Sequence, residues 1–251
     1  MPVDNEQGGY AYDPGLRFAS NGVVALPGMT IERGLLPAPL PFADGFAAIE
    51  RHLDAIGRPL GALCGVELRL PATLPLDGFV AFNDRYLAQL DGWGLLRDER
   101  SPLTRTNVSP HAGAPAEPSV LAFSYTLPGE LPTPAFAISG IAEMPLAANY
   151  PDGIVRRGET SEDALVEKAR CVVEVVGGHV RTLGATWDEG ASVHLYSAYP
   201  IAFALSRVVL AQLGVAPAHG IVWHDAAPPV TDLELEVDVR RYAREVAVAA
   251  A

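Results

Sequence analysis

Basic residues are scarce in this sequence. Its 18 lysines and arginines stand against 30 aspartates and glutamates, which gives a formal net charge of −12. So acidic a chain repels phosphate backbones unless a local basic patch overrides the overall field. The longest basic clusters are the pairs Arg156-Arg157 and Arg240-Arg241. We therefore expect no nucleic-acid partner, and a ribonuclease activity is disfavoured.

Cysteines and long apolar runs are scarce as well. The two cysteines, Cys64 and Cys171, lie in apolar stretches without the spacing of a zinc site, so we expect reduced core thiols and no metal. No apolar run approaches the roughly 18 residues that a membrane span needs. The first ten residues, MPVDNEQGGY, show no export signal, so a cytoplasmic location and no membrane contact are expected.

What the sequence does contain is one pattern that occurs twice. The composition is globular, with 49% hydrophobic residues, and 251 residues suit one large domain or two of roughly 125 each. Three segments match between the halves in the same order: 50–60 with 178–187, Val66 and Leu68 with Val193 and Leu195, and the LAQL of 87–90 with that of 210–213. Such internal similarity indicates tandem modules. The proline-rich stretch 127–136 is the natural junction, and we place the modules at 1–130 and 131–251.

The elements of each module follow from apolar spacing. Helices are expected over 42–57 and 78–94 in the first copy, and over 160–184 and 200–214 in the second. Thr160 or Ser161 is the expected N-cap of the third helix. Strands are expected over 62–70, 119–127, 191–199 and 231–239. This order predicts an α+β module whose mixed sheet is covered by two helices on one face and must find a partner for the other.

Several short motifs resemble the RidA/YjgF family. They are AFAISGIAEM (135–144) for its early strand, AFNDRYL (81–87) for its second helix, LTRTNV (103–108) for its arginine strand and LELEVDV (233–239) for its closing strand. Longer strings such as RTNVSP and PDGIVRRGETSEDALVEKAR resemble the two-module aminomuconate and 2-amino-5-chloromuconate deaminases. The resemblance implies two tandem RidA-like, chorismate-mutase-like modules, each a mixed sheet packed against two helices. It also implies a homo-oligomer, most simply a trimer of two-module chains.

In the family, an arginine binds the substrate carboxylate and a glutamate handles the attacking water, between neighbouring modules. The matching residues divide between the copies: Arg105 and Asn83 in the first, and Ser139, Gly140 and Glu236 in the second. The first copy has Phe123 at the place of the glutamate, and the second has about Ile221 at the place of the arginine. The resemblance therefore implies one composite site where the two repeats meet.

These residues suit the hydrolysis of an enamine or imine beside a carboxylate, which yields a 2-oxo acid and ammonia. The guanidinium of Arg105 can grip a carboxylate with two hydrogen bonds, and a partly buried Glu236 can pass protons near neutral pH. The pair Ser139-Gly140 can offer a hydroxyl and a close backbone N–H, and Asn83 a neutral hydrogen bond. This chemistry requires no metal or organic cofactor.

Other interpretations remain open at this point. Arg105 could form a surface ion pair, Glu236 could lie on a solvated strand face, Ser139-Gly140 could be only a tight bend, and Asn83 could be a helix-surface amide. A related enzyme of a biosynthetic pathway could use the same residues on another amino acid-derived imine. A non-enzymatic ligand-binding or holdase module would also lose half of a site in each copy.

Overall fold

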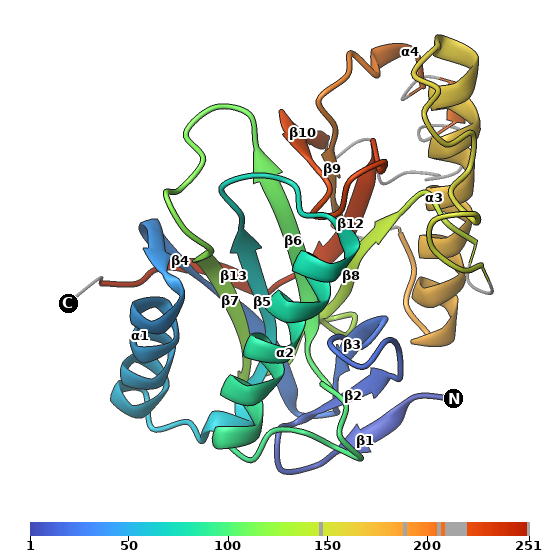
Figure 1. Ribbon diagram of the computed structural model, residues 1–251. Coiled ribbons are helices and arrows are strands. Elements are labelled where there is room, and N and C mark those ends of the chain that lie inside the picture. Colours follow the sequence, from blue (N-terminus) through green and yellow to red (C-terminus); the bar gives the residue numbers. More distant parts are fainter. Residues whose placement is uncertain (146–147, 188–189, 205–206, 209–219, 250–251) are drawn as a thin grey trace.

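Two mixed β-sheets form the centre of the protein (Figure 1). The structure is a computed structural model that describes residues 1–251 apart from 146–147, 188–189, 205–206, 209–219 and 250–251. The first sheet has the order β11-β6-β5-β7-β4-β13. Its strands are β4 (Met29–Pro41), β5 (Leu63–Arg69), β6 (Thr104–Pro110), β7 (Ser119–Pro128), β11 (Ala226–Ala227) and β13 (Arg244–Ala247). Helices α1 (Phe42–Ala55) and α2 (Leu76–Gly92) pack against its outer face, and a 3-10 turn spans Leu60–Ala62.

The second sheet has the order β1-β2-β3-β8-β12-β9-β10. Its strands are β1 (Val3–Asn5), β2 (Tyr10–Asp13), β3 (Gly22–Ala25), β8 (Phe136–Ala142), β9 (Ser192–Tyr196), β10 (Ile221–His224) and β12 (Glu236–Arg241). The long helix α3 (Glu162–Thr182) covers its outer face, as Figure 1 shows, and a short helix α4 comprises Ala202–Ala204. The architecture is therefore mixed α+β, as predicted. Among the described residues, no helix is both long and apolar enough to cross a membrane.

The two sheets share one strand order. In the first sheet β6, β5, β7 and β4 lie side by side, and in the second β10, β9, β12 and β8 do. The pairs β5–β6 and β9–β10 are parallel, whereas the other neighbours in both sets are antiparallel. The pattern that the sequence repeats thus corresponds to the same arrangement of strands in each half of the chain.

Strands from the two ends of the chain cross between the halves. Strand β3, near the amino terminus, pairs with β8 in the second sheet. Strand β13, near the carboxyl terminus, pairs with β4 in the first sheet, and β11 pairs with β6. Each sheet is therefore completed by a segment from the other half, which ties the halves together more closely than a simple linker would.

The helices begin and end where local chemistry predicts. The Oγ of Ser161 accepts a hydrogen bond from the amide N of Ala164 at 3.4 Å, so Ser161, and not Thr160, caps α3. The chain leaves α1 and α3 through Gly57 and Gly184, which have φ of +67° and +69°. The helix expected over 200–214 is described only at its start, and the second LAQL (210–213) lies outside the described residues.

The unpartnered sheet faces that the sequence predicts are turned toward each other within one chain. The Oγ1 of Thr106 on β6 donates to Asp238 on β12 at 2.8 Å, and Arg240 on β12 reaches Glu67 on β5 at 2.5 Å. The strand expected over 231–239 begins only at Glu236, and both of its faces are buried. The interpretation of Glu236 as a residue on a solvated face is therefore wrong, because the first sheet covers that face.

Candidate active site

The outer edge of β6 is where the two halves of the chain exchange polar contacts. The amide N–H of Arg105 donates to Ser139 Oγ on β8 at 3.0 Å, and that hydroxyl donates to the carbonyl oxygen of Ser20 at 2.6 Å. Two residues further along β6, the backbone N–H of Asn107 hydrogen bonds to the carboxylate of Glu236. These edge donors would otherwise be buried without a partner, which is costly. The structure thus brings together Arg105, Ser139 and Glu236, as the sequence predicts.

Gly140 allows Glu236 to approach this edge. A Cβ added at Gly140 would lie 1.9 Å from Oε1 of Glu236, well inside the contact distance of any two heavy atoms. Only glycine therefore leaves room for the carboxylate at its present place. The Ser139 hydroxyl is already occupied on both sides, so Ser139 and Gly140 position the neighbouring groups.

Glu236 is a buried carboxyl group with a perturbed pKa. It is 3% exposed, and burial raises its pKa to about 8, with a further rise from Asp238. The Asn107 N–H and the positive charges of Arg105 and Arg69 act in the opposite direction. A carboxyl group with a pKa near neutrality can both accept and return a proton under physiological conditions, which is the property of a general acid–base group.

Arg105 is a buried guanidinium in an aromatic cage. It is 5% exposed, and its Cζ lies 4.3 Å from the ring centroid of Phe18 and 5.0 Å from that of Tyr86. Phe79 and Phe82 complete the cage. Burial lowers the pKa of Arg105 to about 10, against the effects of Tyr86 and Glu236, so the group stays charged at neutral pH.

This guanidinium is not part of a surface ion pair. Among the described residues no carboxylate forms a salt bridge with Arg105, and its Nη1 has no hydrogen-bond partner. A buried cation without a close counter-ion is costly. The arrangement is typical of a site that holds an anion from outside the chain, with the aromatic rings offering partial compensation.

Three buried polar side chains of α2 and β6 lack full hydrogen-bond partners, among them Tyr86 of the cage. Asn83 Oδ1 and both side-chain polar atoms of Asn107 are buried and unpaired, and these residues are 4% and 3% exposed. The Tyr86 hydroxyl lies near Ser101 without a hydrogen bond of ordinary geometry, and burial raises its pKa to about 12. Each buried polar group of this kind costs about 1–3 kcal/mol unless a water or ligand satisfies it. This group of buried side chains is therefore chemically incomplete by itself.

The sequence analysis did not single out Asn107 and Tyr86. The signals that could have found them are spacing signals: Asn107 lies two residues after Arg105, on the same strand face, and Tyr86 lies three residues after Asn83, on the same helix face. Asn83 itself is buried, so its interpretation as a helix-surface amide is wrong.

The strand register tests which positions of the two repeats correspond. Arg105 pairs with Val66, and Ile221 pairs with Val193, the counterpart of Val66. Ile221 therefore has the same register position beside β9 that Arg105 has beside β5, and its match to the family arginine stays a prediction. The prediction for Phe123 is wrong. It too pairs with Val66, and it packs in the core beneath the helices, whereas Glu236 faces the other sheet.

The register counterpart of Glu236 in the first sheet is Ser119. Glu236 pairs with Tyr196 on β9, and Ser119 pairs with Arg69, which occupies the corresponding position on β5. An irregular register between Glu67 and Leu68 on β5 shifts the alignment at this point. That irregularity skips a single residue, whereas the sequence motif placed the counterpart at Phe123, four positions further along β7.

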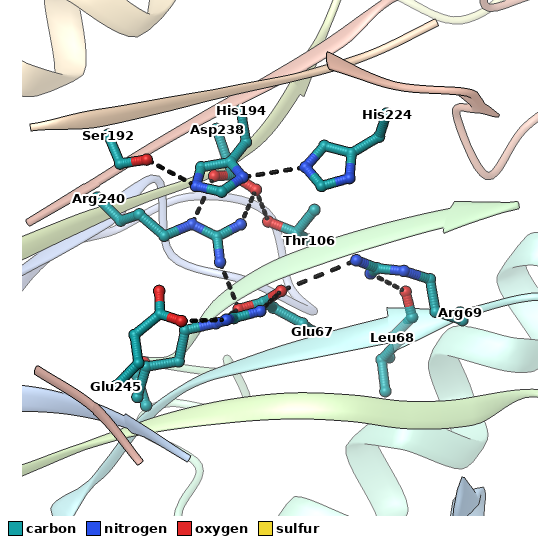
Figure 2. A network of polar contacts seen from close by, with 12 residues as sticks. Glu67, Leu68, Arg69, Thr106, Ser192, His194, His224, Asp238, Arg240 and Glu245 are labelled. Atoms are coloured by element: carbon teal, nitrogen blue, oxygen red, sulfur yellow. Dashed lines mark hydrogen bonds and ion pairs between the residues drawn. The ribbon is translucent and has the colours of Figure 1, made fainter. Parts of the chain in front are cut away.

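A second polar network, which the sequence analysis did not predict, fastens the two sheets together (Figure 2). Arg33 forms hydrogen bonds of 2.5 and 2.8 Å with the two carboxylate oxygens of Glu67, and Arg240 contacts both Glu67 and Asp238. Burial by itself would raise the pKa of Glu67, but Arg240 and Arg33 hold it well below its usual range. Tyr196 also donates to Asp238, at 2.9 Å.

At the rim of this network lies a pair of histidines. His194 Nδ1 is 3.0 Å from His224 Nε2, and the Oγ of Ser192 is 2.9 Å from His194 Nε2. Burial lowers the pKa of each histidine to about 4, so both are neutral at physiological pH. Among the described residues, no group of three or more His, Cys, Asp or Glu side chains could hold a metal ion.

Comparisons with known proteins give the family. A model of the family described as 2-aminomuconate deaminase CnbZ matches residues 2–246. A 2-amino-5-chloromuconate deaminase from Comamonas testosteroni is 40% identical over 241 residues, which cover 95% of each chain. A chorismatase structure, 14% identical, has a TM-score of 0.45 and covers 96% of this chain and 80% of its own. A cyanuric acid hydrolase structure from A. caulinodans, 12% identical, has a TM-score of 0.40 and covers 86% and 68%. TM-scores this low do not establish a shared fold.

The family model and the curated relative each span nearly the whole chain, and the protein therefore belongs to the 2-aminomuconate deaminase CnbZ family.

Proposed function

We propose that this protein is an enzyme that hydrolyses the imine form of a 2-aminomuconate-like dicarboxylate to the 2-oxo acid and ammonia. The observation that carries the proposal is the pairing of two unusual buried groups at the edge of β6. Arg105 is a buried cation that forms no salt bridge with any described residue, and Glu236 is a carboxyl group with a pKa of about 8. The family and the 40% identical deaminase support the substrate class.

The substrate binds first through Arg105. A guanidinium holds a carboxylate in a fixed plane by two parallel hydrogen bonds, and Nη1 of Arg105 is available for one of them. The amides of Asn83 and Asn107 supply acceptors and donors for the amino or imino nitrogen beside that carboxylate. Holding the substrate in this way makes the attack of a water effectively intramolecular, which is worth several kcal/mol of the barrier.

The reaction then needs Glu236 to carry two protons to the substrate nitrogen, one after the other. Tautomerisation of the enamine transfers an N–H proton to carbon and leaves a C=N bond. Glu236 takes a proton from a water as its oxygen bonds to the C=N carbon, while the π electrons pass to nitrogen. Glu236 returns that proton to the nitrogen, which gives a carbinolamine with a hydroxyl and an –NH2 group on one carbon. Glu236 then takes the hydroxyl proton and passes it to the nitrogen, the C–N bond breaks, and ammonia leaves as the C=O bond forms. A carboxyl group whose pKa lies near the working pH suits both transfers.

We also propose that the two halves are RidA-like modules, 1–130 and 131–251, joined in one chain. The shared strand order of the two sheets and the division of the site between them support this interpretation. We further expect chains to assemble, most simply as trimers, and to work in the cytoplasm. Light scattering on the purified protein tests the assembly, and a monomeric mass would contradict it.

The experiment that tests the proposed function is ammonia release from freshly generated 2-aminomuconate, measured against the spontaneous rate. A second substrate, the imine of a small monocarboxylic amino acid, is measured in parallel. We expect faster release with the protein and a preference for the dicarboxylate. A preference for the small imine would favour the biosynthetic-type alternative. No acceleration with either substrate would favour a binding or holdase role and would overturn the proposal.

A further inference from the structure

Three arginines enter the buried network between the sheets, and one of them is poorly paired. Arg33 and Arg240 each contact carboxylate oxygens at ordinary ion-pair distances. The Nη2 of Arg69 lies 3.8 Å from Glu67, and its Nη1 donates only to the carbonyl oxygen of Leu68, at 2.9 Å. Figure 2 shows Arg69 at the end of the network, with Glu67 on one side only.

The charges of this interior do not balance. The three guanidiniums share two buried carboxylates, those of Glu67 and Asp238, while Glu245 on Arg33 is half-exposed. Arg69 has a side chain only 8% exposed, so solvent screens its charge poorly. A buried guanidinium whose nearest carboxylate is already bound by two other arginines retains most of its capacity to bind a further anion.

Arg69 lies in the same part of the inter-sheet space as Glu236. Its Cζ is 5.8 Å from the ring centroid of Tyr196, and Tyr196 pairs directly with Glu236 across β9 and β12. Directly paired residues of neighbouring strands have their side chains on the same face of the sheet. Arg69 also pairs with Val108, which forms a small apolar cluster with Tyr196 and Ala226.

Tyr196, whose ring stacks on His224 with a centroid distance of 4.5 Å, thus neighbours both the Arg69 guanidinium and the proposed acid–base group. Arg105 lies on β6, the strand whose edge Glu236 reaches, and Arg69 lies beside Tyr196, the strand neighbour of Glu236. The charges of both guanidiniums lower the pKa of the Glu236 carboxyl. A substrate that matches two separate guanidiniums near one acid–base group carries a negative charge at each end.

From this arrangement we infer that Arg69 binds the second carboxylate of the substrate and so selects dicarboxylates over monocarboxylates. The inference rests on the proposed function, in which Arg105 holds the carboxylate next to the reacting carbon. Arg69 would contact the substrate far from the C–N bond. Its loss should therefore weaken substrate binding and raise KM, with a much smaller effect on kcat.

The test compares a dicarboxylate with its distal monoamide, in which the far carboxylate carries no charge. We expect Arg69→Gln to lower kcat/KM for 2-aminomuconate on the order of 10- to 100-fold through KM, because a charge-assisted contact is lost. The loss with the monoamide should be severalfold smaller, and Arg69→Lys should recover part of the dicarboxylate activity. Equal losses with the two substrates, or no loss with the dicarboxylate, would overturn the inference.

Arg33→Gln is the matched control, because Arg33 belongs to the same network but is held by two carboxylates. We expect it to lower the melting temperature and to affect the two substrates equally. If Arg69→Gln does not fold, the wild-type preference for the dicarboxylate over the monoamide decides, and no preference would overturn the inference.

Binding separates this inference from the proposed reaction. Calorimetry with muconate and with muconate monoamide, neither of which carries an amino group to lose, measures the second carboxylate contact without turnover. Tighter binding of muconate by the wild type, reduced in Arg69→Gln, supports the inference even if the protein releases no ammonia. Equal affinity for the two probes would contradict it even if the deaminase activity is present.

Discussion

Ser139 Oγ lies 3.0 Å from the amide N of Arg105 and so joins β8, the middle strand of the second sheet, to β6 of the first sheet. The same hydroxyl donates to the carbonyl oxygen of Ser20 at 2.6 Å. One side chain thus satisfies two buried backbone groups and fixes the strand that carries the proposed substrate-binding arginine.

Replacing Ser139 by alanine should therefore cost both stability and activity. The substitution leaves a buried N–H and a buried carbonyl without partners, so we expect a loss of about 1–3 kcal/mol in the free energy of unfolding. Urea denaturation measures it. Thr182→Ala is the control, because its hydroxyl bonds only to the carbonyl oxygen of Gly178 on the exposed side of α3. Equal effects of the two substitutions would show that the contact between the sheets has no special weight.

Gly140→Ala should impair catalysis more than folding. The added methyl group would meet Oε1 of Glu236 at 1.9 Å and push the carboxylate away from the edge of β6. We expect kcat to fall at least about tenfold, as for a misplaced general base. Gly92→Ala is the control, because an added Cβ there meets no neighbouring atom within 4 Å. Unchanged kcat in Gly140→Ala would contradict the role of the Glu236 carboxylate.

The pH dependence of activity should report Glu236. Its base form predominates above its pKa of about 8, so kcat/KM should rise with pH up to that region and then level off. Glu236→Gln should remove this rise together with most of the activity. A wild-type kcat/KM that does not change between about pH 6 and about pH 8 would be inconsistent with this assignment.

The same group gives a stability prediction of defined sign. The folded-state pKa lies above that of an unfolded glutamate, so between these two values the folded protein binds more protons than the unfolded chain. The contribution of Glu236 to stability therefore falls as pH rises through that window. Glu236→Gln should gain stability relative to wild type on going from acid to mildly basic pH, as measured by denaturant midpoints. A constant difference across that range would contradict the raised pKa.

Removing the Glu67 carboxylate should lower the free energy of unfolding much more than removing a surface carboxylate. Its removal leaves Arg33 and Arg240 buried with reduced pairing, and breaking buried ion pairs in this way costs about 3–5 kcal/mol. We expect Glu67→Gln to unfold at clearly lower urea concentration. Glu159→Gln, which removes an exposed partner of Arg156, should change the midpoint little. A small effect at Glu67 would show that the network does not hold the sheets together.

Local patterns predicted the elements of this fold well, and the contacts between the halves less well. Helical spacing located α1, α2 and α3 to within a few residues, and Ser161 caps α3 as a hydroxyl before two acids suggests. The exchange of β3 and β13 between the sheets was not predictable, because edge pairing depends on distant segments that carry no local signal.

The candidate site was predictable in part for the same reason. Arg105, Ser139 and Glu236, which short motifs singled out, lie near one another in the structure. Phe123 was misassigned because the short closing-strand motif does not fix the register, which places Ser119, four residues earlier, opposite Arg69. Arg69 and Glu67 appear in the sequence as ordinary strand residues, and only the packing of one sheet on the other reveals that they are buried.

The central claim is that Arg105 and Glu236, from different halves of the chain, form one working site. The most direct measurement is ammonia release from freshly generated 2-aminomuconate by the wild type, Arg105→Met and Glu236→Gln, with folding checked by circular dichroism. We predict activity in the wild type and losses of at least about a hundredfold in both variants, the usual scale for a general base. An active wild type with a fully active Glu236→Gln variant would contradict the composite site.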